Sequence, residues 1–194
     1  SEVKNIIVNV GDSTKPRLVI GAHYDSHRGP GADDNASGTA GLIELTRLLH
    51  AQKDKLEYNV ELVAYTLEEP PFFKSKLMGS YIHANDLYEN GIEIVGMISI
   101  EMIGYYSDEK DSQDYPTFFL DPFYPNIGNF IAAVSNYKSG RFLSDFKGVF
   151  KKLNTIQLET LKAPSFIKGV DFSDHLNYWD LGYDAIMITN TSFF

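Results

Sequence analysis

The sequence predicts an α/β fold, a three-layer sandwich in which helices flank a mostly parallel, mixed central β-sheet. Two patterns support this prediction. Short apolar runs rich in β-branched and aromatic residues alternate along the chain with segments of helical period. The composition, with 43% hydrophobic and 22% charged residues among 194, is that of one folded domain rather than of a disordered chain.

Each element is predicted from its own local pattern. Two strands at the start, 6–10 and 17–22, are expected to form a hairpin around the turn-rich GDSTKP at 11–16. A helix follows, because Leu42 and Leu45 recur at helical spacing on one face. The later elements are expected, in order, as a buried strand at 58–67, a helix at 75–90, a strand at 92–100, a polar loop at 104–116, a strand at 117–120, helices at 127–137 and 144–153, a helix from Ser173, and a strand at 185–189.

Charge and composition exclude several classes of function. The net charge of −9 argues against nucleic acid as a partner, because binding a phosphate backbone requires a basic surface. The absence of Cys excludes disulfides, thiolate catalysis and Cys-ligated zinc. No apolar run is long enough to span a membrane, so we expect no membrane contact from this chain. The oligomeric state is left open.

Acidic and histidine side chains follow the predicted strands. They are His23 and Asp25, Asp33 and Asp34, Glu68 and Glu69, Glu101, and Asp174 with His175. Functional groups of such sheets collect at the carboxyl ends of the strands. Carboxylates placed there repel one another unless a cation offsets them. Imidazoles and carboxylates without a thiolate suit a catalytic zinc site, and the number of ligands predicts two metals that share a bridging carboxylate.

Five motifs, taken together, resemble those of the co-catalytic di-zinc aminopeptidases. The motifs are His23-Tyr24-Asp25, GADDNASG at 31–38, Glu68-Glu69, Glu101-Met102 and Ser173-Asp174-His175, and the resemblance runs from about residue 17 to 190. This bacterial leucyl aminopeptidase-like family also includes glutamate carboxypeptidase II. The glutaminyl cyclases and the catalytically inactive transferrin receptor are its relatives.

The resemblance implies two zinc ions per chain and a role for each matching residue. Asp34 would bridge the ions, with His23 and Glu101 completing one site and Glu69 and His175 the other. Glu68 would be the general base, and Asp25 would orient the His23 imidazole. A cis peptide bond between Asp34 and Asn35 is also implied. Many members have Asp where Glu101 stands, which leaves the preferred metal open.

The function implied by the resemblance is that of a zinc-dependent exopeptidase, most simply an aminopeptidase that acts on a peptide substrate. We expect residues 1–194 to form a single metallopeptidase catalytic domain, truncated at both ends, in an exported protein. A single-zinc cyclase-like acyltransferase and an inactive binding module remain alternatives. Carboxypeptidase action would need a cation for the terminal carboxylate, and Arg28 and Arg141 are the candidates.

Other residues near these motifs are expected to be structural. His27 is interpreted as part of a loop, and His50 and His83 as solvated. PPFF at 70–73 could belong either to the core or to a pocket wall. The aromatic residues Tyr105, Tyr106, Phe142 and Phe166 are expected to pack rather than to line a pocket.

Overall fold

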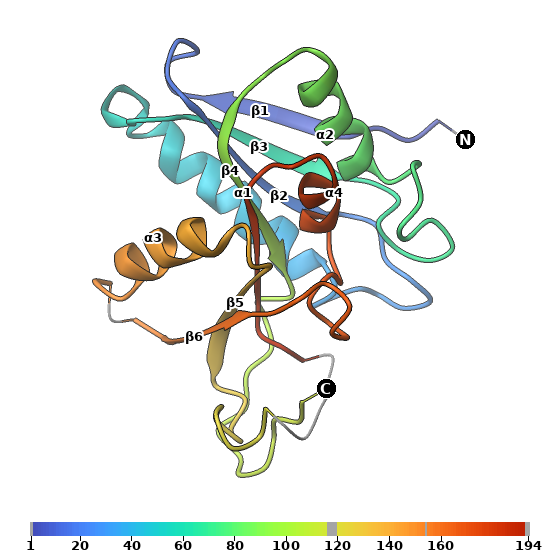
Figure 1. Cartoon of the computed structure of the whole chain (residues 1–194), viewed down its shortest axis with the longest axis vertical. Helices are drawn as coiled ribbons and strands as arrows, with labels where there is room; N and C mark the ends of the chain where they lie inside the picture. Colours follow the sequence, from blue (N-terminus) through green and yellow to red (C-terminus); the bar gives the residue numbers. More distant parts are fainter. Residues whose placement is uncertain (1, 116–119, 154, 193–194) are drawn as a thin grey trace.

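One mixed sheet of seven strands organises the computed structural model, which describes residues 2–115, 120–153 and 155–192. The strands are β1 (Ile6–Val10), β2 (Arg17–His23), β3 (Asn59–Tyr65), β4 (Ile94–Glu101), β5 (Phe130–Ser135), β6 (Gln157–Lys162) and β7 (Ala185–Thr189). Their order in the sheet is β1-β3-β2-β4-β7-β5-β6 (Figure 1). The predicted α/β class is confirmed.

The middle of the sheet is parallel, and this arrangement brings together the strand ends that carry His23 and Glu101. β3, β2, β4 and β7 run in one direction, whereas β1 pairs antiparallel with β3, and β5 pairs antiparallel with β7 and parallel with β6. In register, His23 lies beside Tyr65, and Glu101 lies beside Thr189. The carboxyl ends of four adjacent strands therefore meet at one edge, where ligands of such sheets bind.

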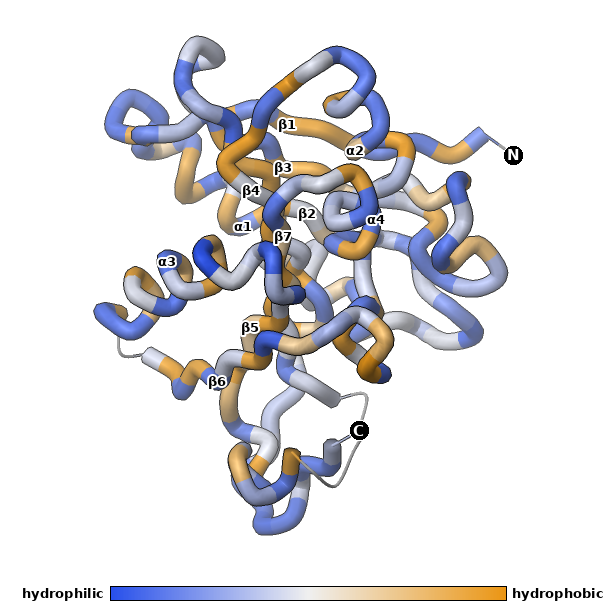
Figure 2. Tube along the Cα trace, viewed as in Figure 1, coloured by the Kyte–Doolittle hydropathy of each residue, from blue (hydrophilic) through white to orange (hydrophobic). Residues whose placement is uncertain are grey.

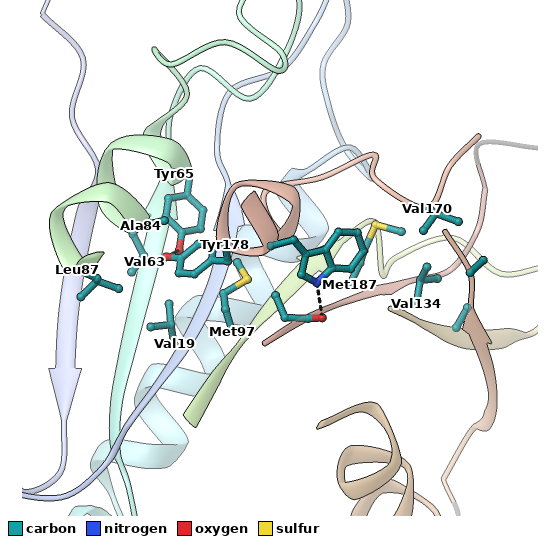
Figure 3. Close-up of a cluster of buried hydrophobic side chains, with 14 of the residues drawn as sticks. Val19, Val63, Tyr65, Ala84, Leu87, Met97, Val134, Val170, Tyr178 and Met187 are labelled. Atoms are coloured by element: carbon teal, nitrogen blue, oxygen red, sulfur yellow. Dashed lines mark hydrogen bonds between the residues drawn. The ribbon is translucent and has the colours of Figure 1, made fainter. Parts of the chain in front are cut away.

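Helices cover both faces of the sheet. One face packs against α1 (Ala36–His50) and α3 (Gly140–Phe150), because Ile98 of β4 belongs to the apolar clusters of both helices. The opposite face packs against α2 (Gly79–Glu89) and α4 (His175–Asp180). Figure 3 shows labelled side chains of this second core, including Val63 of β3 and Met97 of β4. In Figure 2 the hydrophobic colour is concentrated on strands such as β1 and β3.

Buried polar side chains interrupt the second core. The hydroxyls of Tyr65 and Tyr178 lie 2.6 Å apart, and His83 Nδ1 lies 2.6 Å from the Tyr178 hydroxyl. His83 Nε2 is 3.1 Å from Glu61, which also pairs with Arg17. The prediction that His83 is solvated was wrong, because its side chain connects α2 to the sheet through these contacts.

The predicted hairpin at the start of the chain was also wrong. β1 pairs antiparallel with β3, and β2 pairs parallel with the other edge of β3. β3 lies between the first two strands because its apolar residues are buried almost throughout, so the strand requires a partner on each edge.

Sequence reasoning was least accurate between residues 105 and 162. The helix predicted at 127–137 is instead strand β5, all six residues of which are buried. A short run that is buried on both faces shows neither the period of a helix nor that of a strand, so its sequence does not distinguish a helix from a strand. The next helix, α3, occupies 140–150 rather than 144–153, and β6 was not predicted. The strand predicted at 117–120 lies outside the described residues, apart from Leu120, which is in a bend.

Among the described residues, no helix combines the length and apolar character needed to cross a membrane.

Candidate metal centre

Three predicted ligands converge at the carboxyl edge of the sheet. His23 ends β2, Glu101 ends β4, and Asp34 lies in the loop before α1. His23 Nε2 is 3.2 Å from Asp34 Oδ1 and 3.3 Å from Glu101 Oε2. Among the described residues, these three form a group whose ligand atoms all lie within 4.8 Å of one another. One imidazole and two carboxylates are a donor set that suits zinc.

The hydrogen bonds around the cluster leave it prepared for a cation. His23 Nδ1 donates to the main-chain oxygen of Asp25 at 3.1 Å, so the lone pair of the neutral ring lies on Nε2. Among the described atoms, His23 Nε2 and Glu101 Oε1 are buried and have no hydrogen-bond partner. Buried polar atoms without partners are costly, and a metal ion would satisfy both atoms. The residues present therefore fit the metal that the resemblance implies.

Burial and mutual repulsion control the charges at this edge. Burial raises the pKa of Glu101 and of Glu68, whereas the nearby His23 opposes the rise in both. Burial together with the charge of Asp34 raises the pKa of Glu69. For His23, burial alone would lower the pKa, but the surrounding carboxylates of Asp25, Asp34 and Glu101 raise it well above its ordinary value. The surrounding carboxylates therefore favour positive charge at this point.

Asp25 connects two strand ends. Its Oδ1 accepts from the backbone N–H of Glu68 at 3.2 Å, and its Oδ2 accepts from that of Glu69 at 3.1 Å. Its carboxylate is 3.6 Å from His23 Nδ1, so the closer contact to the ring is the Asp25 main-chain oxygen. Despite partial burial, hydrogen bonds from His23 and the two amides hold the pKa of Asp25 below its ordinary value. The structure thus gives Asp25 a second role, that of fixing the Glu68-Glu69 segment beside His23.

The two adjacent glutamates occupy different positions. Glu68 is buried, and its carboxylate lies 3.8 Å from His23 Nε2, close to the cluster but outside the three-ligand group. Glu69 is half-buried, and its Oε1 accepts the backbone N–H of His27 at 3.0 Å. The His27 ring contacts the Pro70 oxygen at 3.1 Å, which agrees with its interpretation as a loop residue.

Asn35, which sequence reasoning did not single out, positions Asp34. Its Nδ2 donates to the Ile100 oxygen at 2.8 Å, and its Oδ1 accepts from Gly38 N and Met102 N, both at 3.1 Å. The loop before α1 is thereby fixed to the end of β4. A Cβ on Gly38 would lie 2.2 Å from Asn35 Oδ1, so this close approach requires glycine. The expected cis bond between Asp34 and Asn35 is present.

The Ser-Asp-His motif contributes its serine to the cluster. Ser173 Oγ donates to Glu101 Oε2 at 2.7 Å and contacts Ser99 Oγ at 2.9 Å. Asp174 is fully buried, and burial raises its pKa to about 7. The sequence analysis assigned no contact to Ser173. Its position in the Ser-Asp-His motif, two residues before the predicted ligand His175, could have indicated one.

His175 is not one of the three residues whose ligand atoms converge. Its Nε2 donates to the Val170 oxygen at 2.8 Å, and its ring packs edge-on against Trp179, with centroids 4.4 Å apart. Its Nδ1 is buried without a partner among the described atoms, and burial lowers its pKa to about 4. His175 as a zinc ligand therefore stays a prediction.

A small pocket opens over the cluster, with a volume of about 110 Å³. Its lining combines four carboxylates with three apolar residues, and consists of Asp34, Glu68, Glu69, Glu101, Pro70, Phe73 and Phe172. None of these described lining residues is Lys or Arg. Arg28 lies in an exposed loop, and Arg141 lies on α3. Phe73 therefore belongs to the pocket wall, which decides the question left open for PPFF.

Comparisons with known proteins agree with this geometry. The model of peptidase family M28 matches residues 5–193. The protein YfbL of Escherichia coli K12 is 46% identical over an alignment of 200 positions that covers 98% of this chain and 60% of YfbL. Leucine aminopeptidase 1 of Sclerotinia sclerotiorum is 31% identical over 61% of this chain and 34% of its own length.

Solved structures share the fold. The zinc aminopeptidase BSAP of Bacillus subtilis superposes with a TM-score of 0.69 at 19% identity, covering 95% of this chain and 39% of BSAP. A glutaminyl cyclase of Porphyromonas gingivalis gives a TM-score of 0.63 at 19% identity, covering 96% of this chain and 62% of the cyclase. The chain spans at most about 60% of the length of the curated relatives named above.

Proposed function

The chain belongs to peptidase family M28, and from that premise we propose that it is a zinc-dependent exopeptidase that acts as an aminopeptidase. The observation that carries the proposal is the convergence of His23, Asp34 and Glu101 on one point, with the lone pair of His23 directed at it. The leucine aminopeptidase and zinc aminopeptidase among the comparison proteins support it.

The pocket favours an amino terminus over a carboxyl terminus. Four carboxylates line one side of it, and no described lining residue is cationic. A protonated or metal-facing α-amine would be stabilised there, whereas a terminal carboxylate would be repelled. This asymmetry supports aminopeptidase rather than carboxypeptidase action.

His23, Asp34 and Glu101 would hold one zinc ion, and Glu69 and His175 would join Asp34 at a second. Bound zinc lowers the pKa of a water toward 7 and polarises a substrate carbonyl. Asp34 is suited to bridging the two ions because its carboxylate lines the same pocket as Glu69 and Glu101. Ser173 orients the Glu101 carboxylate, and the Asp25 main-chain oxygen orients the His23 ring.

Glu68 is the proposed general base. It lines the pocket beside the cluster without being one of the three converging ligands, so its carboxylate is available to take a proton from water. It then gives that proton to the leaving amine. The Asp25 carboxylate accepts the backbone N–H groups of both Glu68 and Glu69, which holds Glu68 beside the cluster.

Metal analysis and a substrate panel test this function together. The protein is reconstituted with zinc, its metal content is measured by elemental analysis, and hydrolysis of aminoacyl p-nitroanilides is compared with hydrolysis of their N-acetylated forms. We expect two zinc ions and cleavage only of the free-amine substrates. Cleavage of only the blocked substrates would contradict the proposal. One zinc ion with cyclisation of an amino-terminal glutamine would favour the cyclase, and no bound zinc would favour a binding module.

A further inference from the structure

The apolar side of the pocket consists of two aromatic rings from distant segments. Phe73 lies in the loop after β3, and Phe172 lies in the loop before α4. Their rings meet edge to face, with centroids 6.2 Å apart, an arrangement that aromatic pairs prefer. Both rings line the same pocket as the four carboxylates. We refer to Phe73 and Phe172 as the aromatic wall.

An ion pair joins the same two segments directly behind the aromatic wall. Lys74 Nζ lies 2.5 Å from Asp171 Oδ2, and the Asp171 side chain is only 18% exposed. The same ammonium is 5.5 Å from the Phe73 ring centroid and 5.8 Å from that of Phe172. One cation therefore contacts the partner carboxylate and both rings, and each of these interactions is stronger for being partly shielded from water.

The ion pair also borders a second, larger cleft. This cleft has a volume of about 570 Å³, and Lys74 and Asp171 line it along with Tyr81, Asn136 and Lys138. The ion pair joins segments 97 residues apart in the sequence, and the same two segments carry the two rings of the aromatic wall.

We propose that Lys74 and Asp171 are positioning residues that set the side-chain specificity of the catalytic pocket by holding the aromatic wall in place. The inference rests on the proposed aminopeptidase function. A volume of about 110 Å³ is somewhat smaller than the roughly 150 Å³ of a cavity that binds benzene, so the pocket has space for one small apolar group. With the α-amine at the carboxylates, that group is the side chain of the amino-terminal residue, and the distance of the wall from the carboxylates limits its size.

The test compares substrate preference in matched variants. Lys74→Met keeps the aliphatic stem and removes the charge, Asp171→Asn removes the partner charge, and Lys74→Arg restores a cation. Lys76→Met is the control, because Lys76 lies in the same loop and contacts Tyr81 instead of the wall. For each variant, kcat and KM are measured on leucine and alanine p-nitroanilides, together with zinc content and melting temperature.

We expect the leucine-to-alanine ratio of kcat/KM to fall about tenfold in Lys74→Met and in Asp171→Asn, mainly through KM for leucine, with zinc content unchanged. The ratio in the double variant should be no lower than in either single variant, because both substitutions remove the same contact. Lys74→Arg should recover most of the ratio, and Lys76→Met should stay within twofold of the wild type. An unchanged ratio in Lys74→Met, or an equal loss on both substrates, would overturn the proposal.

A binding measurement separates failure of this inference from failure of the proposed function. Calorimetry compares leucine hydroxamate with glycine hydroxamate on the zinc-loaded protein, and it requires no turnover. If the wild type prefers leucine hydroxamate but cleaves no anilide, the aminopeptidase assignment fails. The binding preference of the variants then still tests whether Lys74 and Asp171 position the aromatic wall. Loss of that preference in Lys74→Met supports the positioning role, and its retention overturns it.

Discussion

Replacing Asn35 by alanine should destabilise the whole domain as well as the metal centre. Asn35 is 1% exposed, and its amide makes three hydrogen bonds to backbone groups of the α1 start and the β4 end. Alanine would leave Gly38 N, Met102 N and the Ile100 oxygen without these partners in a place that water does not reach.

The magnitude follows from these three groups. Loss of the helix cap at Gly38 costs about 1 kcal/mol. Each of the other two buried backbone groups left without a partner costs about 1–3 kcal/mol. The sum is roughly 3–7 kcal/mol, a large share of the 5–15 kcal/mol typical of a domain. Because Asn35 holds the loop that carries Asp34, zinc affinity should fall about 10- to 100-fold as well.

Urea unfolding and zinc titration measure the two effects. Asn129→Ala serves as the control, because Asn129 is exposed and makes a surface hydrogen bond to Asp108. We expect the control to change the unfolding free energy by less than about 0.5 kcal/mol. If Asn35→Ala stays within 1 kcal/mol of the wild type and binds zinc equally well, the three hydrogen bonds do not organise the site, and the reasoning is refuted.

Three further variants test other parts of the site and the core. Glu68→Gln should keep its zinc by elemental analysis but lose about 10²- to 10⁴-fold in kcat, and unaltered turnover would reject Glu68 as the base. Ser173→Ala should raise the zinc dissociation constant about tenfold, measured by competition with a chelator, because Glu101 loses its orienting hydrogen bond. Despite its burial, Glu61 has its pKa held below the ordinary value of 4.5 by His83 and Arg17, so the stability it contributes is complete above pH 4.5 and is lost as the pH falls below that value. Melting temperatures of the wild type and Glu61→Gln should therefore converge below pH 4.5, and a constant difference would contradict this linkage.

The sequence predicted the parts of the fold and site that depend on local pattern. The strand ends that carry His23, Glu68 and Glu101 follow apolar runs, and in a parallel sheet those ends meet at one edge. The pairing of β1 with β3 could not be predicted in the same way, since it depends on which strand needs partners on both edges. The buried run of β5 has no period of its own, and only its place between β7 and β6 makes it a strand.

The supporting residues of the site were missed for a related reason. Asn35 acts through Ile100 and Met102, which are 65 and 67 positions away, and Ser173 acts through Glu101, 72 positions away. A polar residue in a loop has no sequence pattern that identifies such a partner. The Phe73 and Phe172 pair is separated even further, so its place on one pocket wall emerges only from the fold.

The Ser-Asp-His motif shows how far a matching motif can be carried residue by residue. Ser173 precedes α4, whereas His175 is the first residue of that helix, so the two side chains have different contacts. Ser173 Oγ donates to Glu101, whereas the His175 ring, two positions on, contacts Val170 and Trp179. The motif therefore identifies a segment that contacts the metal centre through Ser173, and the role of His175 as a zinc ligand stays a prediction.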